Sequence, residues 1–187
     1  MKWFLVLSSV LCVSLFSPFK VIAEDVDLGV YSSYWGTEDG EDAFGLGARF
    51  AFPVISDPFQ FEFRISRYND LTKNNEPDIQ ATPLEFGLAF RPDLPLLSPY
   101  ASAGLGYYFF DASQNVSIRN EWGWYLATGL EFELPLGFGI FAELNYRHVE
   151  SEIRGDLSNF DGLDFTNITA DYDLSGFGAN VGLNFKW

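Results

Sequence analysis

The amino-acid sequence predicts an all-β fold, an eight-stranded antiparallel up-and-down transmembrane β-barrel. Three observations support this prediction. Apolar residues recur at every second position in eight segments, which is the period of a strand with one apolar face. Beyond the first 23 residues, no apolar stretch reaches the roughly 20 residues that a membrane-spanning helix needs. In the middle of the segments, charged residues lie on the less apolar face.

Residues 1–23 have the features of a secretory signal peptide that is removed. Lys2 supplies a positive charge, residues 3–16 form a short apolar stretch, and residues 21–23 resemble a small-residue cleavage site. We therefore expect the barrel domain to be residues 24–187. Cys12, the single cysteine, lies in the leader, so we expect no disulfide in the domain.

The first four predicted strands lie in the first half of the domain. Each has Phe, Leu, Ile or Val on one face, alternating with smaller or polar residues on the other. Polar loops are expected at 36–42 and 69–78, and a short proline-containing turn at 53–58. The four predicted strands are 26–35, 44–52, 59–66 and 84–91.

The last four predicted strands follow a second proline-containing turn at 92–99. A third short turn is expected at Pro135–Gly137, and polar loops are expected at 111–120 and 149–172. The closing strand alternates as far as Trp187, and we expect it to lie beside the first strand. These four predicted strands are 100–109, 122–134, 140–147 and 177–187.

The connections alternate between short turns and longer polar loops. An even strand number with this alternation is typical of bacterial outer-membrane barrels, and it places both termini on the periplasmic side. Aromatic residues near the strand ends predict two girdles at the membrane interfaces. Those near the loops are Tyr34, Trp35, Tyr107, Phe109, Trp122, Trp124 and Tyr146, and those near the turns are Phe52, Phe59, Phe90, Phe132, Phe185 and Trp187.

The charges on the less apolar faces balance, although the whole chain has a net charge of −15. A soluble sandwich is the alternative fold, but its wet faces should share the acidic excess. A charge facing lipid costs about 2–4 kcal/mol at mid-depth, whereas opposite charges inside a barrel can pair. We predict an interior charge network formed by Arg49, Arg64, Arg91, Arg147 and Lys186 with Glu62, Glu85, Glu131, Glu133 and Glu143.

Four stretches resemble the small outer-membrane β-barrel domains that are similar to the transmembrane domain of outer membrane protein A. They are 99–108, 128–132, 141–147 and 182–187. The resemblance covers residues 24–187 and implies the same architecture, with roles in adhesion or envelope integrity. It also implies that Trp187, with Phe185 before it, is the signal that the barrel-assembly machinery recognises, and that outer-membrane lipid and lipopolysaccharide surround the barrel.

The acidity of the chain argues against nucleic acid as a partner, because phosphate binding needs a basic surface. An eight-stranded barrel is only wide enough for its interior side chains. We therefore expect a monomer without a cofactor that has a structural or surface-contact role through its acidic external loops. Small interior residues such as Gly87 and Ser102 leave a small-ligand-binding or narrow transport barrel as an alternative.

A lipid A-modifying enzyme of the deacylase type is the second alternative. Such chemistry needs a serine, a histidine and an acid, and the candidates are His148, Ser151 and Glu150. Their spacing differs from the His-x-Ser-Asn pattern of lipid A deacylases, so we predict no catalytic residues. The acidic residues Glu38, Asp39, Glu41 and Asp42 are candidates for binding a divalent cation. They lack the spacing of a dedicated calcium loop, and we predict no metal site.

Overall fold

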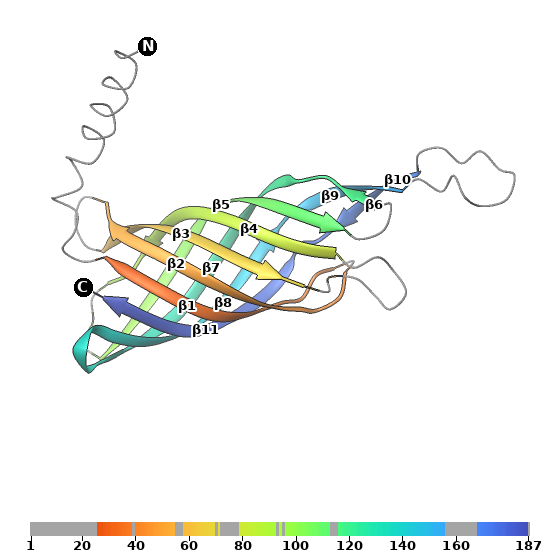
Figure 1. Cartoon of the computed structure of the whole chain (residues 1–187). Helices are drawn as coiled ribbons and strands as arrows, with labels where there is room; N and C mark the ends of the chain where they lie inside the picture. The colour runs from red at the N-terminus through yellow and green to blue at the C-terminus, as the bar shows by residue number, and fades with distance from the viewer. Residues whose placement is uncertain are drawn as a thin grey trace, which may run out of the picture.

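Eight long antiparallel strands close into a barrel in the computed structural model (Figure 1). The structure describes residues 26–38, 40–54, 58–69, 71, 79–92, 94, 96–112, 116–155 and 168–186. The barrel strands are β1 (Asp27–Trp35), β2 (Ala43–Pro53), β3 (Phe59–Tyr68), β4 (Ile79–Phe90), β5 (Leu97–Ala112), β7 (Glu121–Leu134), β8 (Phe138–His148) and β11 (Gly176–Lys186). The predicted fold class is confirmed. The predicted leader, 1–23, lies outside the described residues.

The first and last strands close the barrel, as predicted. β1 pairs with β2 on one side and with β11 on the other, from Asp27 opposite Lys186 to Trp35 opposite Gly178. The start of β1 and the end of β11 therefore lie at one end of the barrel, together with the short connections. We call this the turn end, and the opposite end the loop end.

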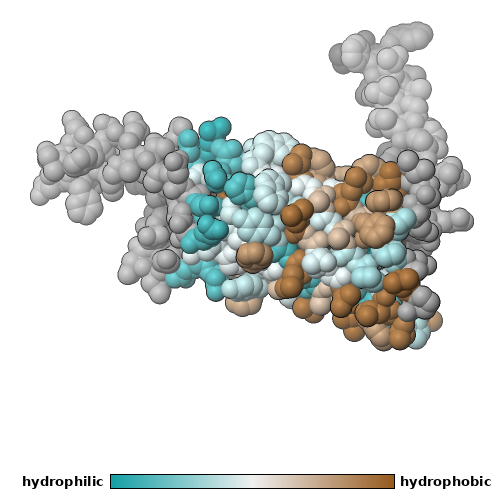
Figure 2. Space-filling view, turned by 180° about the vertical axis from the view of Figure 1, so that it is seen from behind, coloured by the Kyte–Doolittle hydropathy of each residue, from teal (hydrophilic) through white to brown (hydrophobic). Residues whose placement is uncertain are grey.

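Side chains alternate between the inside and the outside of the barrel wall. On β3, Phe61 and Phe63 are exposed, whereas Glu62 and Arg64 are at most 2% exposed. Figure 2 shows hydrophobic residues around the turn-end half of one face and hydrophilic residues near the loop end. No helix among the described residues is long and apolar enough to span a bilayer. An apolar outside around a polar inside is the pattern of a barrel surrounded by lipid.

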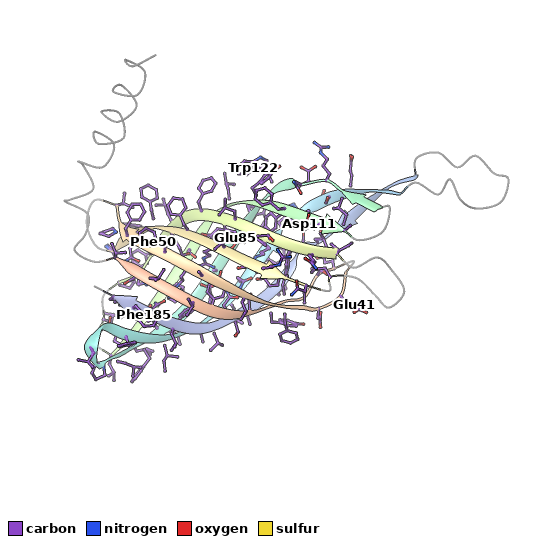
Figure 3. The ribbon with its side chains drawn as sticks, viewed as in Figure 1. Glu41, Phe50, Glu85, Asp111, Trp122 and Phe185 are labelled. Carbon is purple, nitrogen blue, oxygen red and sulfur yellow. The ribbon has the colours of Figure 1, made fainter. Side chains whose placement is uncertain are left out.

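The predicted girdles are correct for most outward aromatic residues and wrong for Trp35. Trp122 is 61% exposed and lies on the outside in Figure 3. Trp35 and Asp27 are an even number of residues apart on β1, so their side chains point to the same side of the wall. Trp35 is completely buried inside the barrel. The period-two pattern therefore decided its side of the wall, and closeness to a loop did not. Trp187 lies outside the described residues.

Strand β4 begins at Ile79, five residues before the predicted start at Leu84. The pairing of β4 with β3 is interrupted near the start of β4. Residues Phe59 to Ile65 of β3 are paired with β4, and pairing resumes only at Tyr68. The interruption lies at Pro83, which has no backbone N–H to donate to a neighbouring strand. The prediction missed this part of β4 because proline usually marks the end of a strand.

Three further strands form a second sheet at the loop end, where the sequence analysis predicted only loops. They are β6 (Val116–Ile118), β9 (Glu150–Gly155) and β10 (Ile168–Asp173), in the order β10-β9-β6. We call them the outer sheet. Only Val149 separates β8 from β9, so the outer sheet continues the barrel wall beyond the loop end (Figure 1). The predicted loops at 111–120 and 149–172 are therefore wrong in part.

Candidate functional site

The inside of the barrel at the turn end holds a cluster of ion pairs. Arg91 follows β4, and its Nη1 lies 2.7 Å from Asp27 Oδ2 and 3.2 Å from Glu131 Oε2. Lys186 Nζ lies 2.9 Å from Glu131 and 2.6 Å from Glu133. Glu131 thus lies near both of these cations, and Arg49 is a third. Asp27 was missed by the sequence analysis, although its position in β1 places it on the inner face.

The middle of the barrel is occupied by two arginines, Arg49 and Arg64, that share Glu143. Arg64 donates to both carboxylate oxygens of Glu143, at 2.7 and 2.9 Å, and to Glu62 Oε1 at 2.6 Å. Arg49 donates to Glu131 at 3.3 Å and lies 3.9 Å from Glu143. Two-point arginine-carboxylate contacts are among the stronger hydrogen bonds in proteins, so they fix both side chains across the barrel.

Among the described residues inside the barrel, Arg147 and Glu85 form the ion pair nearest the loop end. Arg147 Nε donates to Glu85 Oε1 at 2.8 Å, and the Tyr108 hydroxyl donates to the same oxygen at 3.2 Å. The Arg147 guanidinium also lies 5.5 Å from the ring centre of Trp35. Glu85 lies within the barrel in Figure 3. The structure thus brings all ten predicted network residues into ion pairs or charged hydrogen bonds inside or at the mouth of the barrel.

We call this set the ion-pair plug, and its members are at most 5% exposed except for Lys186 and Glu133 at the turn-end mouth. Burying a charge is tolerable only when it is paired and hydrogen-bonded. Neutral side chains supply part of the bonding, because Asn180 donates to Glu143 and Asn184 donates to Glu131. Both asparagines belong to β11 and are buried on its inner face.

Beyond Arg147, the inside of the barrel is apolar. Trp35 packs on Tyr68 and Tyr108, with ring centres 5.2 and 6.0 Å apart. Leu71, which follows β3, and Leu174, which precedes β11, are completely buried in the same cluster. We call this the apolar cluster, and its remaining members are Ala43, Ile79, Ala81, Phe110, Ile118 and Val149. It was not predicted, because nine of its eleven members come from outside the predicted strands.

The three candidate catalytic residues do not form a single cluster. His148 Nδ1 lies 2.9 Å from the hydroxyl of Ser175, and its Nε2 lies 3.8 Å from Glu150. Ser151 is buried elsewhere and donates to the backbone oxygen of Arg119. Ser175 is 1% exposed, and its hydroxyl also accepts the N–H of Val149. A hydroxyl held in this way joins two loop-end segments.

The acidic residues of the first loop are spread along the backbone of the loop end. The backbone N–H of Glu38 donates to the backbone oxygen of Ser175, and the backbone N–H of Glu41 donates to the backbone oxygen of Leu71. Asp39 lies outside the described residues, and Asp42 directly precedes β2. Within the described residues, no group of three His, Cys, Asp or Glu side chains could hold a metal ion.

Phe185 and Phe138 pack edge to face at the turn end, with ring centres 4.9 Å apart. They lie opposite each other on β11 and β8. Phe185 is partly buried and belongs to the outward apolar face near the end of the closing strand. Recognition of this residue by the barrel-assembly machinery stays a prediction.

Comparison with known proteins places the chain in a family. The sequence profile of the outer membrane protein beta-barrel domain matches residues 9–185. This chain belongs to that family. The family is one of bacterial outer-membrane proteins, in agreement with the apolar outer face and the paired charges inside. No curated protein matches the sequence.

Solved outer-membrane barrels share the fold. The outer membrane protein OprG from Pseudomonas aeruginosa is similar with a TM-score of 0.73 and 16% identity, over 89% of this chain and 97% of that chain. Outer membrane protein AlkL has a TM-score of 0.62 and 15% identity, over 89% of this chain and 91% of that chain. Neisserial surface protein A has a TM-score of 0.62 and 14% identity, over 87% of this chain and 96% of that chain. At these identities the similarity concerns the architecture.

Proposed function

We propose that this family member is a closed outer-membrane barrel that anchors the outer sheet and displays it outside the cell for surface contact. The ion-pair plug is the observation that carries the proposal. It crosses the barrel at three depths, at Glu131, Glu143 and Glu85, with an arginine bonded to each. A barrel of eight strands has room for little else, so a straight aqueous path through it is unfavourable.

The orientation in the membrane is part of the same proposal. The short connections, the start of β1 and the end of β11 gather at the turn end, and short turns of outer-membrane barrels face the periplasm. We therefore assign both termini to the periplasmic side and the outer sheet to the exterior. Its edge strands, β6 and β10, each pair with β9 on one side, and exposed strand edges are templates for pairing with another chain.

Contacts between loop-end segments support display over catalysis. His148 and Val149 both bond to the hydroxyl of Ser175, and Leu174 N–H donates to the backbone oxygen of Val149. These bonds attach the segment before β11 to the start of β9. We infer that His148 and Ser175 have this positioning role, which requires no activity toward lipid A.

Cysteine labelling in intact cells tests the orientation and display. Arg119 is exposed beside the outer sheet, and Leu136 is 92% exposed in the turn after β7. A membrane-impermeant maleimide should label Arg119→Cys in intact cells, and Leu136→Cys only after the outer membrane is opened. The opposite labelling pattern would refute the proposal.

Planar bilayer recording tests the closed interior. The purified wild-type chain should not conduct, whereas Arg64→Ala should show openings, because its guanidinium spans the barrel between Glu62 and Glu143. Trp122→Ala, on the outer face, is the matched control and should stay silent. Steady conductance of the wild-type chain would contradict the plugged interior.

The interrupted pairing at Pro83 favours a second candidate function, the sideways passage of small apolar molecules through the wall. Tyr68 and Ala81 flank the interruption and belong to the apolar cluster, so an apolar route from the loop end to the lipid is short there. Replacement Pro83→Val restores a backbone N–H and should abolish uptake of a fluorescent apolar dye into proteoliposomes. Equal uptake by wild-type and protein-free vesicles would exclude this function.

A further inference from the structure

Arg67 is an outward-facing cation at the loop-end border of the apolar belt. The outer face of β3 reads Phe59, Phe61, Phe63, Ile65 and then Arg67, and the first four are 41–52% exposed. Successive outward residues on a strand are about 6.6 Å apart, so Arg67 lies one such step beyond the last apolar residue. In a barrel surrounded by lipid, the border of the apolar belt is where acyl chains give way to headgroups.

Among the arginines and lysines with described contacts, Arg67 differs in having no carboxylate partner. The interior arginines and Lys186 are all ion-paired, and the exposed Arg119 lies 2.9 Å from Glu121 and 3.9 Å from Glu152. Arg67 instead donates from Nη2 to the neutral Gln80 Oε1 at 2.5 Å. No carboxylate of the described residues lies within 4.0 Å of it. The amide of Gln80 orients the guanidinium without neutralising it.

A groove of about 400 Å³ runs along the barrel wall beside Arg67. Phe44 and Leu46 form its apolar part and are 74% and 70% exposed, more than the neighbouring phenylalanines of β3. Its polar side is formed by Arg67 and Asn69, and its small residues are Ser32 and Gly45. Ser32, Leu46 and Arg67 are direct neighbours across β1, β2 and β3. A charged side chain and an apolar surface therefore lie side by side in this groove.

We propose that this groove binds a phosphorylated glycolipid of the lipid A type from the outer leaflet. An acyl chain lies along Phe44 and Leu46, and a phosphate accepts hydrogen bonds from the Arg67 guanidinium. The planar guanidinium matches phosphate geometry, and charge-assisted bonds of this kind are about twice as strong as neutral ones. Charge complementarity selects the occupant, because the Arg67 guanidinium faces no carboxylate among the described residues and attracts an anionic headgroup.

This site rests on the proposed orientation, since the loop end must face outward to meet the outer leaflet. The two can fail separately. Binding measured in detergent micelles does not depend on orientation in a cell, whereas the cysteine labelling above measures orientation alone. Binding in micelles with a reversed labelling pattern would therefore reject the orientation and leave the lipid chemistry of the groove intact.

Native mass spectrometry of the full chain, folded in detergent, tests the proposal. The probes are bis-phosphorylated lipid A, the same lipid after removal of both phosphates, phosphatidylglycerol and phosphatidylcholine. The wild-type chain should retain phosphorylated lipid A above the other three. Arg67→Gln should lower this retention by about tenfold, the loss expected for one charge-assisted bond.

Two further variants keep the outcome interpretable. Arg119→Gln removes an exposed but ion-paired arginine and should retain lipid A as the wild type does. Leu46→Ser should weaken both the phosphorylated and the dephosphorylated lipid, because it acts on the acyl part of the groove. Folding of each variant is checked by the mobility difference between heated and unheated samples on a detergent gel.

Three results would overturn the proposal. Equal retention of lipid A by Arg67→Gln and the wild type would remove the phosphate contact. Equal retention of dephosphorylated lipid A would show a purely apolar groove. Equal retention of phosphatidylglycerol would show that any anionic lipid suffices, which rejects the glycolipid as the occupant.

Discussion

Replacing Glu143 by glutamine removes the carboxylate that joins the middle of the ion-pair plug. Its oxygens accept from Arg64 at 2.7 and 2.9 Å, from Asn180 at 2.7 Å and from Tyr100 at 3.0 Å. The side chain is 1% exposed, so water cannot replace the lost charge. The substitution Glu143→Gln leaves Arg64 with Glu62 as its remaining anionic partner.

The expected cost follows from this burial. Removing one member of a buried ion pair destabilises a protein by about 3–5 kcal/mol, because the other charge stays buried without compensation. With a urea dependence of about 2 kcal/mol per molar, the unfolding midpoint of Glu143→Gln should fall by about 2 M. The measurement is tryptophan fluorescence of the barrel in lipid vesicles during equilibrium urea unfolding.

The matched control is Glu150→Gln, the same chemical change at a side chain that is 71% exposed. Surface pairs contribute about 0–1 kcal/mol, so its unfolding midpoint should stay within about 0.5 M of the wild type. If Glu143→Gln loses less than about 1 kcal/mol, the plug does not hold the barrel together, and the reasoning from burial fails.

Other substitutions test separate parts of the structure. Trp35→Ala should cost about 3–5 kcal/mol in vesicle unfolding, whereas Trp122→Ala on the lipid side should cost less; equal losses would contradict the inside position of Trp35. Ser175→Ala should cost about 1–3 kcal/mol, because the buried N–H of Val149 loses its acceptor. The same variant should leave lipid A unchanged in mass spectra of whole cells, and a changed acylation pattern would show that Ser175 is a nucleophile after all.

The sequence was sufficient for those features that depend on a period of two. The alternation along each strand fixed which side chains point inward, and therefore the members of the plug, because the outside of the wall excludes charge. It also contained two facts that the prediction missed. Asp27 and Trp35 both lie on the inner face of β1, and following the alternation to its end would have placed both inside.

Features that depend on contacts between distant segments could not be read from the sequence. The partner of His148 is Ser175, 27 residues away, and not Ser151, because Ser151 turns inward on β9 toward Arg119. The outer sheet was missed for a similar reason. Its strands are short, between 3 and 6 residues, and their pairing depends on the barrel strands that precede them.

The ion-pair plug and the apolar cluster meet at Arg147, and this contact explains how the outer sheet is held. On its turn-end side, Arg147 is bonded to Glu85, and its guanidinium lies 5.5 and 5.6 Å from the ring centres of Trp35 and Tyr68. Leu71, Val149 and Leu174 pack in the cluster of those rings and come from three loop-end segments. Loosening the ion pair should therefore loosen the segments that lead to the outer sheet. The plug is thus connected, through Arg147 and the apolar cluster, to the segments that lead to the outer sheet.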